Sequence, residues 1–311
     1  MGPPHGRRVR LVGCVRWLRR VTIALAIDGT DWHARVLLRA LAAHGADVLP
    51  IRLGHCAFDT TAPHGLRLPG FAKTLPDAVL VRAISGGSFE EVTRRLGILH
   101  ALRELGVPVW NDARAIERCV DKSTTSFFLA HAGLPTPPTW AVEGPEAART
   151  IAERETQAGR LVLKPLFGSQ GRGLRLIEHP EDLPPPADVA GIYYLQRYIA
   201  PSGTGFADQR LFVCDGEVVG AMTRRSSHWI TNIGRGAAPE ALTPSPDVAD
   251  LALRAAASVG AEFAGVDLLR DRAGQTFVLE VNSMPAWRGL QKVTPVSIAD
   301  HVAAALLRRL G

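Results

Sequence analysis

The chain has 311 residues, which is enough for two or three compact layers and a sizeable core, and its composition is ordinary for a globular protein. The formal net charge is +6, but the first twenty residues contain six arginines and no acid, so the remaining residues sum to zero. The positive charge therefore belongs to a short segment and not to a binding face, which removes the main support for nucleic-acid binding. We expect residues 1–20 to be a basic, disordered extension.

The sequence also contains no transmembrane segment and no zinc-binding motif. The apolar run at residues 21–27 is much shorter than the roughly 20 residues that a membrane-spanning helix needs. The four cysteines are scattered without a CxxC pair, and the ten histidines include no HExxH or His-x-His pattern. We therefore expect a reduced, cytoplasmic protein that has no zinc site and binds no membrane.

Predicted strands and helices alternate in the first third of the chain. The strands are expected at 21–27, 46–53, 77–84 and 107–110, and the helices at 32–45 and 89–105. Ser88 and Glu91 form a capping box at the start of the second helix. Strands that are separated by single helices predict a parallel sheet with both faces covered. No GxGxxG follows the first strand, so a dinucleotide site is not expected. This pattern predicts an α/β domain over residues 21–112.

The remainder of the chain predicts two subdomains, over residues 113–195 and 196–311. Helices are expected at 112–120, 122–133, 145–159, 246–260 and 297–311, and most of the other segments alternate as strands. A proline-rich connector at 134–140 leads into the first of these strands.

The stretch from Leu161 to Ile177 predicts a strand, a glycine-rich loop and a second strand. Lys164 ends the first strand, and the loop contains Gly168, Ser169, Gln170, Gly171 and Gly173. Glycines allow backbone N–H groups to approach an anion closely. The lysine precedes the glycines and no helix follows, so this is not a P-loop. The hairpin suits a flap over nucleotide phosphates, and the alternative is a flexible tip without a ligand.

The next two segments leave alternatives open. The run from Ile192 to Pro201 suits either plain core or a hinge whose backbone reads an adenine edge. A hairpin follows that turns at Asp215-Gly216, with Arg210 and Arg224 at similar distances from the turn. Two arginines on neighbouring strands repel each other unless an anion lies between them. The alternative is a pair of solvated arginines.

Two predicted strands near the C-terminus bring oxygen-bearing side chains together. In TFVLEVN, Glu280 and Asn282 alternate with the apolar residues Phe277, Leu279 and Val281. If Val266 and Leu268 of the preceding strand share that apolar face, Asp267 lies on the face of Glu280 and Asn282. Two carboxylates and an amide suit Mg²⁺, which prefers few carboxylates and leaves positions for phosphates. The sequence therefore predicts a metal site of Asp267, Glu280 and Asn282.

Taken together, these motifs resemble the ATP-grasp superfamily, specifically RimK-like ligases that add α-L-glutamate or a similar amino acid to a carboxylate. The resemblance covers residue 21 to the C-terminus, and its order and spacing are specific. Its strongest positions are Asn111, Asp121, Lys122, the Lys164 glycine loop, Gln196 to Ile199, Asp208, Arg210, Arg224, Asn232, Arg235, Gly236, Asp267, Glu280 and Asn282. The resemblance implies an N-terminal pre-ATP-grasp parallel-sheet domain, a small central domain and a β-rich C-terminal domain, so α/β followed by α+β.

The resemblance also implies roles for individual residues. Lys122 and Lys164 contact ATP phosphates, beneath the loop from Gly168 to Gly173. Gln196, Arg197, Tyr198 and Ile199 read adenine largely through the backbone, and Asn232 belongs to the same nucleotide set. Asp267, Glu280 and Asn282 hold Mg²⁺ or Mn²⁺, with two ions expected. Arg224, Arg210 and Arg235 face the transferred phosphoryl group and the substrate carboxylate. The implied activity is an ADP-forming ligation through an acyl phosphate.

Two departures from the family pattern bear on the substrate. Arg197 stands where the family usually has Glu. After Asn282 the family often reads Ser-x-Pro-Gly-Leu-Glu-Gly, whereas residues 283–289 here read SMPAWRG, with Arg288 in place of the acid. This variant resembles ligases of C1-carrier coenzyme biosynthesis, which act on tetrahydromethanopterin or methylofuran. We therefore expect a small-molecule acceptor, with a protein or carrier-protein C-terminus as the alternative.

Other functional classes share some of these features. A kinase of a small carboxylate or sugar needs the same metal and phosphate residues, and a non-catalytic nucleotide-binding module needs fewer of them. Nucleic-acid binding rests on the basic tail alone. Members of the resembling family are often oligomers, which implies a homodimer or homotetramer.

Overall fold

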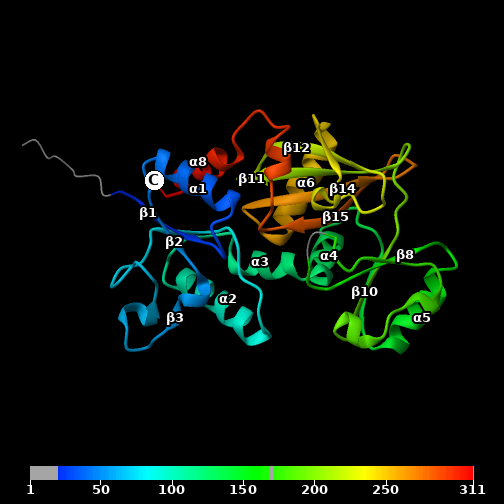
Figure 1. Ribbon diagram of the computed structural model, residues 1–311, viewed down its shortest axis with the longest axis horizontal. Helices are drawn as coiled ribbons and strands as arrows, with labels where there is room; N and C mark the ends of the chain where they lie inside the picture. The colour runs from blue at the N-terminus through cyan, green and yellow to red at the C-terminus, as the bar shows by residue number, and fades with distance from the viewer. Residues whose placement is uncertain (1–19, 169–170, 311) are drawn as a thin grey trace, which may run out of the picture.

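The computed structural model describes residues 20–168 and 171–310. Residues 1–19 of the predicted extension, together with Ser169 and Gln170 of the loop, lie outside the described residues. Three sheets, one parallel and two antiparallel, carry the fold, with a two-stranded ribbon of β3 (Ala57–Phe58) and β4 (Leu66–Arg67) beside them (Figure 1). No helix within the described ranges is long and apolar enough to cross a bilayer.

The N-terminal sheet is parallel, as the alternating pattern predicts. Its order is β2 (Asp47–Ile51), β1 (Thr22–Ala26), β5 (Ala78–Val81) and β6 (Val109–Trp110). Ile23 and Leu25 of β1 pack towards α1 (Trp32–Ala43), whereas Ala24 and Ala26 pack towards α2 (Phe89–Glu104). Both faces are therefore covered, and the capping box of Ser88 and Glu91 at the start of α2 is formed.

The central sheet is antiparallel and carries the glycine loop. Its order is β7 (Thr139–Glu143), β10 (Ile192–Arg197), β8 (Leu161–Lys164) and β9 (Arg175–Ile177). Helix α5 (Pro145–Glu155) covers one face through Ala148, Ile151 and Ala152. The boundary predicted between residues 195 and 196 falls inside β10, because Gln196 pairs with both β7 and β8. The central sheet extends to Arg197.

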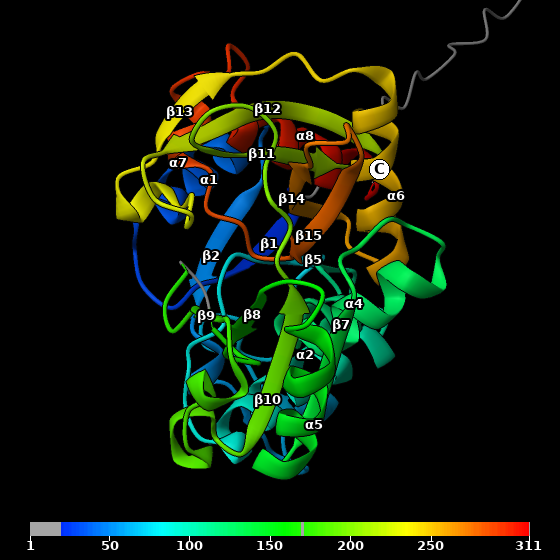
Figure 2. The same ribbon diagram turned by 90° about the vertical axis from the view of Figure 1, so that its right-hand side faces the viewer.

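The C-terminal sheet has the order β13 (Ala238–Ala241), β12 (Glu217–Ser226), β11 (Phe206–Cys214), β14 (Phe263–Arg270) and β15 (Thr276–Asn282). One face packs on α6 (Pro246–Val259) and α4 (Lys122–His131). Helix α3 (Ala113–Val120) contacts α4, α6 and β15, so this predicted part of the central subdomain packs on the C-terminal sheet. At one end of the sheet, the opposite face lies towards β8 and β10 of the central sheet (Figure 2).

A β-bulge between β14 and β15 changes the predicted face of β15. Asp267 pairs with Glu280, but Leu268 pairs with Val278, so Leu279 is an extra residue between these pairs. Val278 and Val281 are consequently buried in the core, whereas Leu279 lines a cavity with Glu280. The prediction that Phe277 and Leu279 share the core face was wrong, because simple alternation does not include the bulge. The pairing of Asp267 with Glu280 survives it.

Several contacts join the N-terminal and C-terminal domains, among them a shared apolar core and a buried asparagine. Helix α8 (Ile298–Arg308), near the end of the chain, packs against α1 and shares one apolar core with β1 and β11. The side chain of Asn111, which is fully buried, donates to the carbonyls of Phe263 and Ser283 at 2.7 and 2.6 Å. It also accepts from the N–H groups of Glu262 and Phe263 at 2.6 and 3.1 Å.

These four hydrogen bonds predict a large stability effect at Asn111. An Asn111→Ala protein leaves buried backbone donors and acceptors without partners, each of which costs about 1–3 kcal/mol. We expect the free energy of unfolding, measured by urea denaturation, to fall by about 3–5 kcal/mol.

Gln157, whose side chain is exposed beyond the end of α5, provides the matched amide control. Gln157→Ala should change the free energy of unfolding by no more than about 0.5 kcal/mol. A loss below about 1 kcal/mol for Asn111→Ala would show that water or rearrangement replaces its bonds and would contradict the role of this side chain.

Candidate functional site

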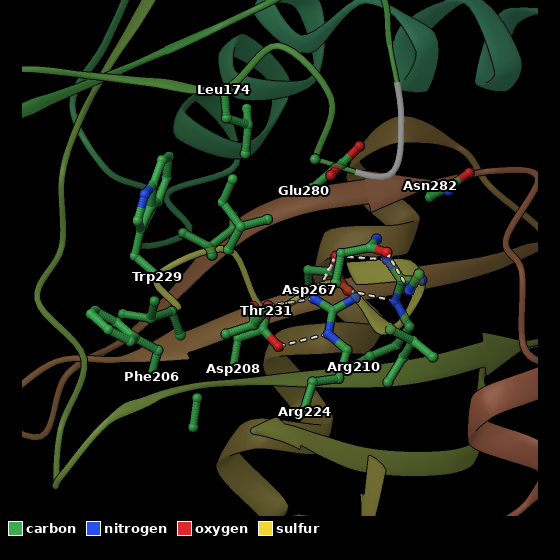
Figure 3. Close-up of a pocket in the computed structure, with 18 of the residues that line it drawn as sticks. Leu174, Phe206, Asp208, Arg210, Arg224, Trp229, Thr231, Asp267, Glu280 and Asn282 are labelled. Carbon is green, nitrogen blue, oxygen red and sulfur yellow. Dashed lines mark hydrogen bonds and ion pairs between the residues drawn. The ribbon is translucent and has the colours of Figure 1, made fainter. Parts of the chain in front are cut away.

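A cavity of about 520 Å³ lies between the central and C-terminal sheets (Figure 3). Its lining includes most of the predicted site residues, from both sheets and from the segment after β12. These are Lys164, Gly171, Gln196, Arg197, Tyr198, Ile199, Arg210, Arg224, Asn232, Asp267, Glu280 and Asn282. The lining does not include Lys122, Gly168, Gly173 or Arg235.

A network of buried charges forms the floor of the cavity. Arg224, which is 4% exposed, donates from Nε to Asp208 Oδ1 at 2.6 Å, and its Nη2 also binds the other Asp208 oxygen. The same Nη2 lies 3.0 Å from Asp267 Oδ2. Arg210 binds Asp267 through two hydrogen bonds of 2.6 and 2.7 Å. The anion that was expected between Arg210 and Arg224 is thus the carboxylate of Asp267 (Figure 3).

The two arginines keep Asp267 ionised. Burial raises the pKa of a carboxyl group, but the adjacent guanidinium groups of Arg210 and Arg224 hold the pKa of Asp267 below its ordinary value. Oδ1 of Asp267 accepts one hydrogen bond from the described residues, so it keeps a lone pair for another partner. A carboxylate in this state can ligate a cation at neutral pH.

The other two predicted metal ligands fit a hard cation. Glu280 lies opposite Asp267 across β14 and β15, and its carboxylate accepts no hydrogen bond from residues 20–168 and 171–310. Asn282 Oδ1 accepts one hydrogen bond, from the N–H of Met284 at 3.0 Å. The described chain contains no group of three or more His, Cys, Asp and Glu side chains placed to hold a metal. The candidate set is therefore two carboxylates and an amide, which are oxygen donors that suit Mg²⁺.

The two predicted phosphate-binding lysines lie in different places. Lys164 Nζ donates to Gln196 Oε1 at 2.7 Å inside the cavity. Burial lowers the pKa of Lys164 to about 8, and the charge of Lys122 adds to this effect, whereas Glu280 and Asp267 oppose it. Lys122 Nζ donates to the carbonyl of Gly168 at 2.9 Å, so it contacts the glycine loop beside the cavity. Burial also lowers the pKa of Lys122.

The glycine loop approaches the opposite wall closely. Gly171 has a φ of +65°, and a Cβ there would lie 2.6 Å from Ile230 Cγ2 and 3.7 Å from Arg235 Nε. Gly173 has a φ of +71°, and its Cβ would meet Pro165 Cγ at 2.7 Å. Any larger residue at either position would strain the loop. Arg235 therefore lies near the loop and not in the network of Arg210 and Arg224.

The predicted hinge segment, residues 196–199, has one free backbone donor. Arg197 N–H donates to the carbonyl of Pro138 at 2.8 Å, and Tyr198 N–H donates to the carbonyl of Arg160 at 2.9 Å. Ile199 N–H makes no hydrogen bond within the described chain although Ile199 lines the cavity. The side chain of Arg197 forms an ion pair with Glu155. The backbone N–H of Ile199 is thus available to donate to a ligand.

Arg82, Asp208 and Trp229 also line the cavity, although they were not among the predicted site residues. Arg82 follows the buried strand β5 at the carboxyl edge of the parallel sheet. A polar residue directly after such a strand is a usable signal. Asp208 was noted only within the family pattern, and its pairing with Arg224 across β11 and β12 explains it. Trp229 carries no comparable signal.

Comparisons with known proteins agree with this architecture. A family model described as the RimK-like ATP-grasp domain matches residues 119–306. The chain is similar to the tetrahydromethanopterin:alpha-L-glutamate ligase of Methanosarcina acetivorans, with 28% identity covering 92% of this chain and 98% of that protein. The protein of the same name from Methanocaldococcus jannaschii is 34% identical, covering 75% of this chain and 79% of that protein.

A solved structure, that of the ATP-grasp ligase PsnB complexed with minimal precursor, Mg and ADP, has a similar fold. Its TM-score is 0.71 at 22% identity, covering 94% of this chain and 97% of that chain. This likeness confirms the predicted ATP-grasp fold, with its parallel N-terminal sheet and antiparallel sheets that follow.

The charge network predicts different stability effects for two adjacent arginines of β12. Arg224→Met leaves Asp208 buried without its cation, and breaking a buried ion pair in this way costs about 3–5 kcal/mol. Arg225 forms a solvent-exposed pair with Glu240 at 2.7 Å, and such pairs contribute at most about 1 kcal/mol. Urea denaturation of Arg224→Met and Arg225→Met should therefore give clearly different midpoints.

Equal midpoints for these two variants would refute the structural importance of the network. The double variant Asp208→Leu with Arg224→Met replaces both charges by apolar groups, so it should recover part of the stability lost in Arg224→Met.

Proposed function

Since the chain belongs to the RimK-like ATP-grasp family, we propose that it is an ADP-forming ligase that joins L-glutamate to the carboxylate of a small-molecule acceptor. The observation that carries this proposal is that two carboxylates and an ammonium group line one cavity. The ionised carboxylate of Asp267, and that of Glu280, which has no hydrogen-bond partner among residues 20–168 and 171–310, line the same cavity as the ammonium group of Lys164. The names of the related ligases support tetrahydromethanopterin, or a coenzyme of that kind, as the acceptor.

The nucleotide would lie between the central and C-terminal sheets. The free N–H of Ile199 supports adenine binding at the hinge segment, residues 196–199. Lys164 supplies positive charge for the phosphates. Lys122 supplies a second positive charge beside the glycine loop, where it donates a hydrogen bond to the carbonyl of Gly168. The close approach of Gly171 to Ile230 supports a loop that covers the phosphates, and Asn232 lines the cavity beneath that loop.

Asp267, Glu280 and Asn282 would hold Mg²⁺, since their oxygen donors fit a hard cation and the similar ligase PsnB was solved with Mg and ADP. Mn²⁺ suits the same donors, and we propose two ions. When bound, the ions neutralise phosphate oxygens and align them for transfer. Arg210 and Arg224 keep Asp267 ionised, so that its carboxylate can serve this purpose at neutral pH.

The proposed reaction has two steps. The acceptor carboxylate attacks the γ-phosphorus of ATP, ADP leaves, and an acyl phosphate forms. The amine of glutamate then attacks the acyl carbon, phosphate leaves, and the nitrogen loses a proton. A fixed donor aimed at a developing oxyanion typically contributes about 10²–10³ in rate. Arg210 and Arg224 at the cavity floor, and Arg235 near the loop, are the candidate donors, although Arg210 and Arg224 already bind carboxylates.

In this proposal the substrates are small molecules, and neither a nucleic acid nor a membrane takes part. The expected homodimer or homotetramer and the cytoplasmic location stay predictions from the sequence.

The ligase activity can be tested with purified protein, Mg-ATP, L-glutamate and tetrahydromethanopterin. We expect ADP release that requires both substrates and, by mass spectrometry, a product heavier by one glutamyl unit. Glu280→Gln removes a metal-ligating charge while keeping the side-chain shape, so turnover should fall by at least about 100-fold.

Glu240→Gln, an exposed carboxylate on β13, is the matched control and should retain normal turnover. ADP release that does not depend on an amine, without a heavier product, would identify a kinase instead of a ligase. Normal turnover in Glu280→Gln would contradict the proposed metal site.

The lowered pKa of Lys164 predicts that nucleotide affinity depends on pH. Below pH 8 the lysine is charged in the free protein and attracts phosphates, but above about pH 8 it loses its proton. Because a bound phosphate raises the pKa of this lysine, the affinity for Mg-ADP should fall by up to about tenfold per pH unit above pH 8.

This pH dependence can be measured by calorimetric titration of Mg-ADP between pH 7 and 9.5. Lys164→Arg keeps its charge throughout this range, so its affinity should change little with pH. A flat profile for the unmodified protein, or an unchanged slope in Lys164→Arg, would show that Lys164 does not bind the phosphates.

A further inference from the structure

The cavity has a second wall that the proposed nucleotide residues do not use. This far wall consists of Arg82 at the carboxyl end of β5 and of Met284, Ala286, Arg288 and Gly289 after β15. In the sheet order β2-β1-β5-β6, β2 lies on one side of β1, and the next strand of this sheet along the chain, β5, lies on the other side of β1. Ligands of open parallel sheets bind at the carboxyl edge where the strand order reverses in this way. Arg82 lies at that edge.

The guanidinium group of Arg82 is held in place but is only partly satisfied. Its side chain is 11% exposed, and one Nη donates to Asp31 Oδ2 at 3.1 Å. Its Nε is buried without a hydrogen-bond partner in the described chain. The guanidinium carbon lies 5.7 Å from the ring centre of the buried Trp287. A fixed, partly buried cation that lines a cavity is arranged to receive an anion.

Asp31, which binds Arg82, also helps to position the backbone of Arg288, because it contacts His33, which accepts the N–H of Arg288. His33 Nδ1 is bonded to Asp31 Oδ2 at 3.0 Å, which leaves Nε2 as an acceptor. Nε2 accepts from the backbone N–H groups of Trp287 and Arg288 at 3.0 and 3.3 Å. The side chain of Arg288 itself is exposed and forms no hydrogen bond or ion pair with the described residues. Asp31 and His33 are therefore positioning residues for the far wall.

The charges of the far wall are unbalanced. His33 is neutral in this arrangement, because its Nε2 accepts hydrogen bonds from two N–H groups. Of the two guanidinium groups on the far wall, only that of Arg82 is paired with a carboxylate, Asp31, within the described residues, so the positive charge of Arg288 has no carboxylate partner there. Guanidinium groups bind carboxylates with matched, bidentate geometry.

We propose that Arg82 and Arg288 form a subsite for a substrate carboxylate that ATP does not activate. The inference rests on the proposed ligase function and adds a specificity-determining role for these two residues. Such a carboxylate has two possible sources. Both carboxylates of the incoming L-glutamate stay unreacted when its amine attacks, and the acceptor can carry a second carboxylate beside the one that is activated.

The test is calorimetric titration of the Mg-ADP-loaded protein, with L-glutamate in one arm and tetrahydromethanopterin in the other. Arg82→Gln and Arg288→Gln should each lower the affinity of the protein for one of these two ligands by about 10- to 100-fold, because a charge-assisted contact is lost. Loss in the L-glutamate arm assigns the subsite to the incoming amino acid, and loss in the other arm assigns it to the acceptor.

Arg225→Gln, an exposed arginine of β12 outside the cavity, is the matched control and should leave both affinities unchanged. Unchanged affinity for both ligands in both cavity variants overturns the subsite, as does a wild-type protein that binds Mg-ADP but neither ligand. A wild-type protein that does not bind Mg-ADP contradicts the proposed function itself. Normal Mg-ADP affinity in the variants shows that they are folded.

The positioning role of His33 has its own readout. His33→Gln can keep an acceptor near the position of Nε2, whereas His33→Ala cannot. We expect His33→Ala to lower the affinity for the same ligand as Arg288→Gln does. His33→Gln should retain much of the affinity that His33→Ala loses. An equal loss in both variants would mean that His33 does not act by accepting these two N–H groups.

Discussion

The carboxylate of Asp267 is the group on which the cavity depends. Asp267 lies on β14, which pairs with β11 in the C-terminal sheet. Its carboxylate contacts Arg210 of β11 and Arg224 of β12. A buried carboxylate without such partners would be protonated or would destabilise the fold. The two arginines solve this problem while leaving a lone pair on one oxygen, so that the requirement for stability and the requirement for cation binding are met by the same contacts.

The cavity also depends on contacts between parts of the chain that are distant in sequence. Asn111 ties the end of the parallel sheet to the beginning of β14 and to Ser283. His33 ties α1 to the segment that contains Arg288. Both side chains bind backbone groups, so they fix the path of the chain around the site. The cavity is consequently assembled from three sheets although its charged floor comes from one.

Local patterns predicted the elements and most of the floor, and long-range contacts decided the remainder. The pairing of Asp267 with Glu280 follows from hydrophobic alternation, but the bulge at Leu279 does not, because a single inserted residue leaves no mark on a two-residue period. For Arg210 and Arg224 the sequence left open an intervening anion or two solvated arginines, and the identity of the anion depended on β14 lying beside β11. The contacts of Arg82 and His33 with the segment around Trp287 join residues more than two hundred positions apart, so local patterns could not predict them.

The packing of α8 against α1 has a consequence for the synthesis of this chain. A ribosome releases β1 and α1 well before α8, and domains usually fold as units when they emerge. Here the apolar core that contains Ile23, Leu25 and Leu37 also contains Val302 and Leu306 of the last helix. The parallel-sheet domain therefore completes this core only after α8 has been translated. Until then, the apolar surface of β1 and α1 stays exposed on the nascent chain, and exposed apolar surface of this kind is prone to aggregation.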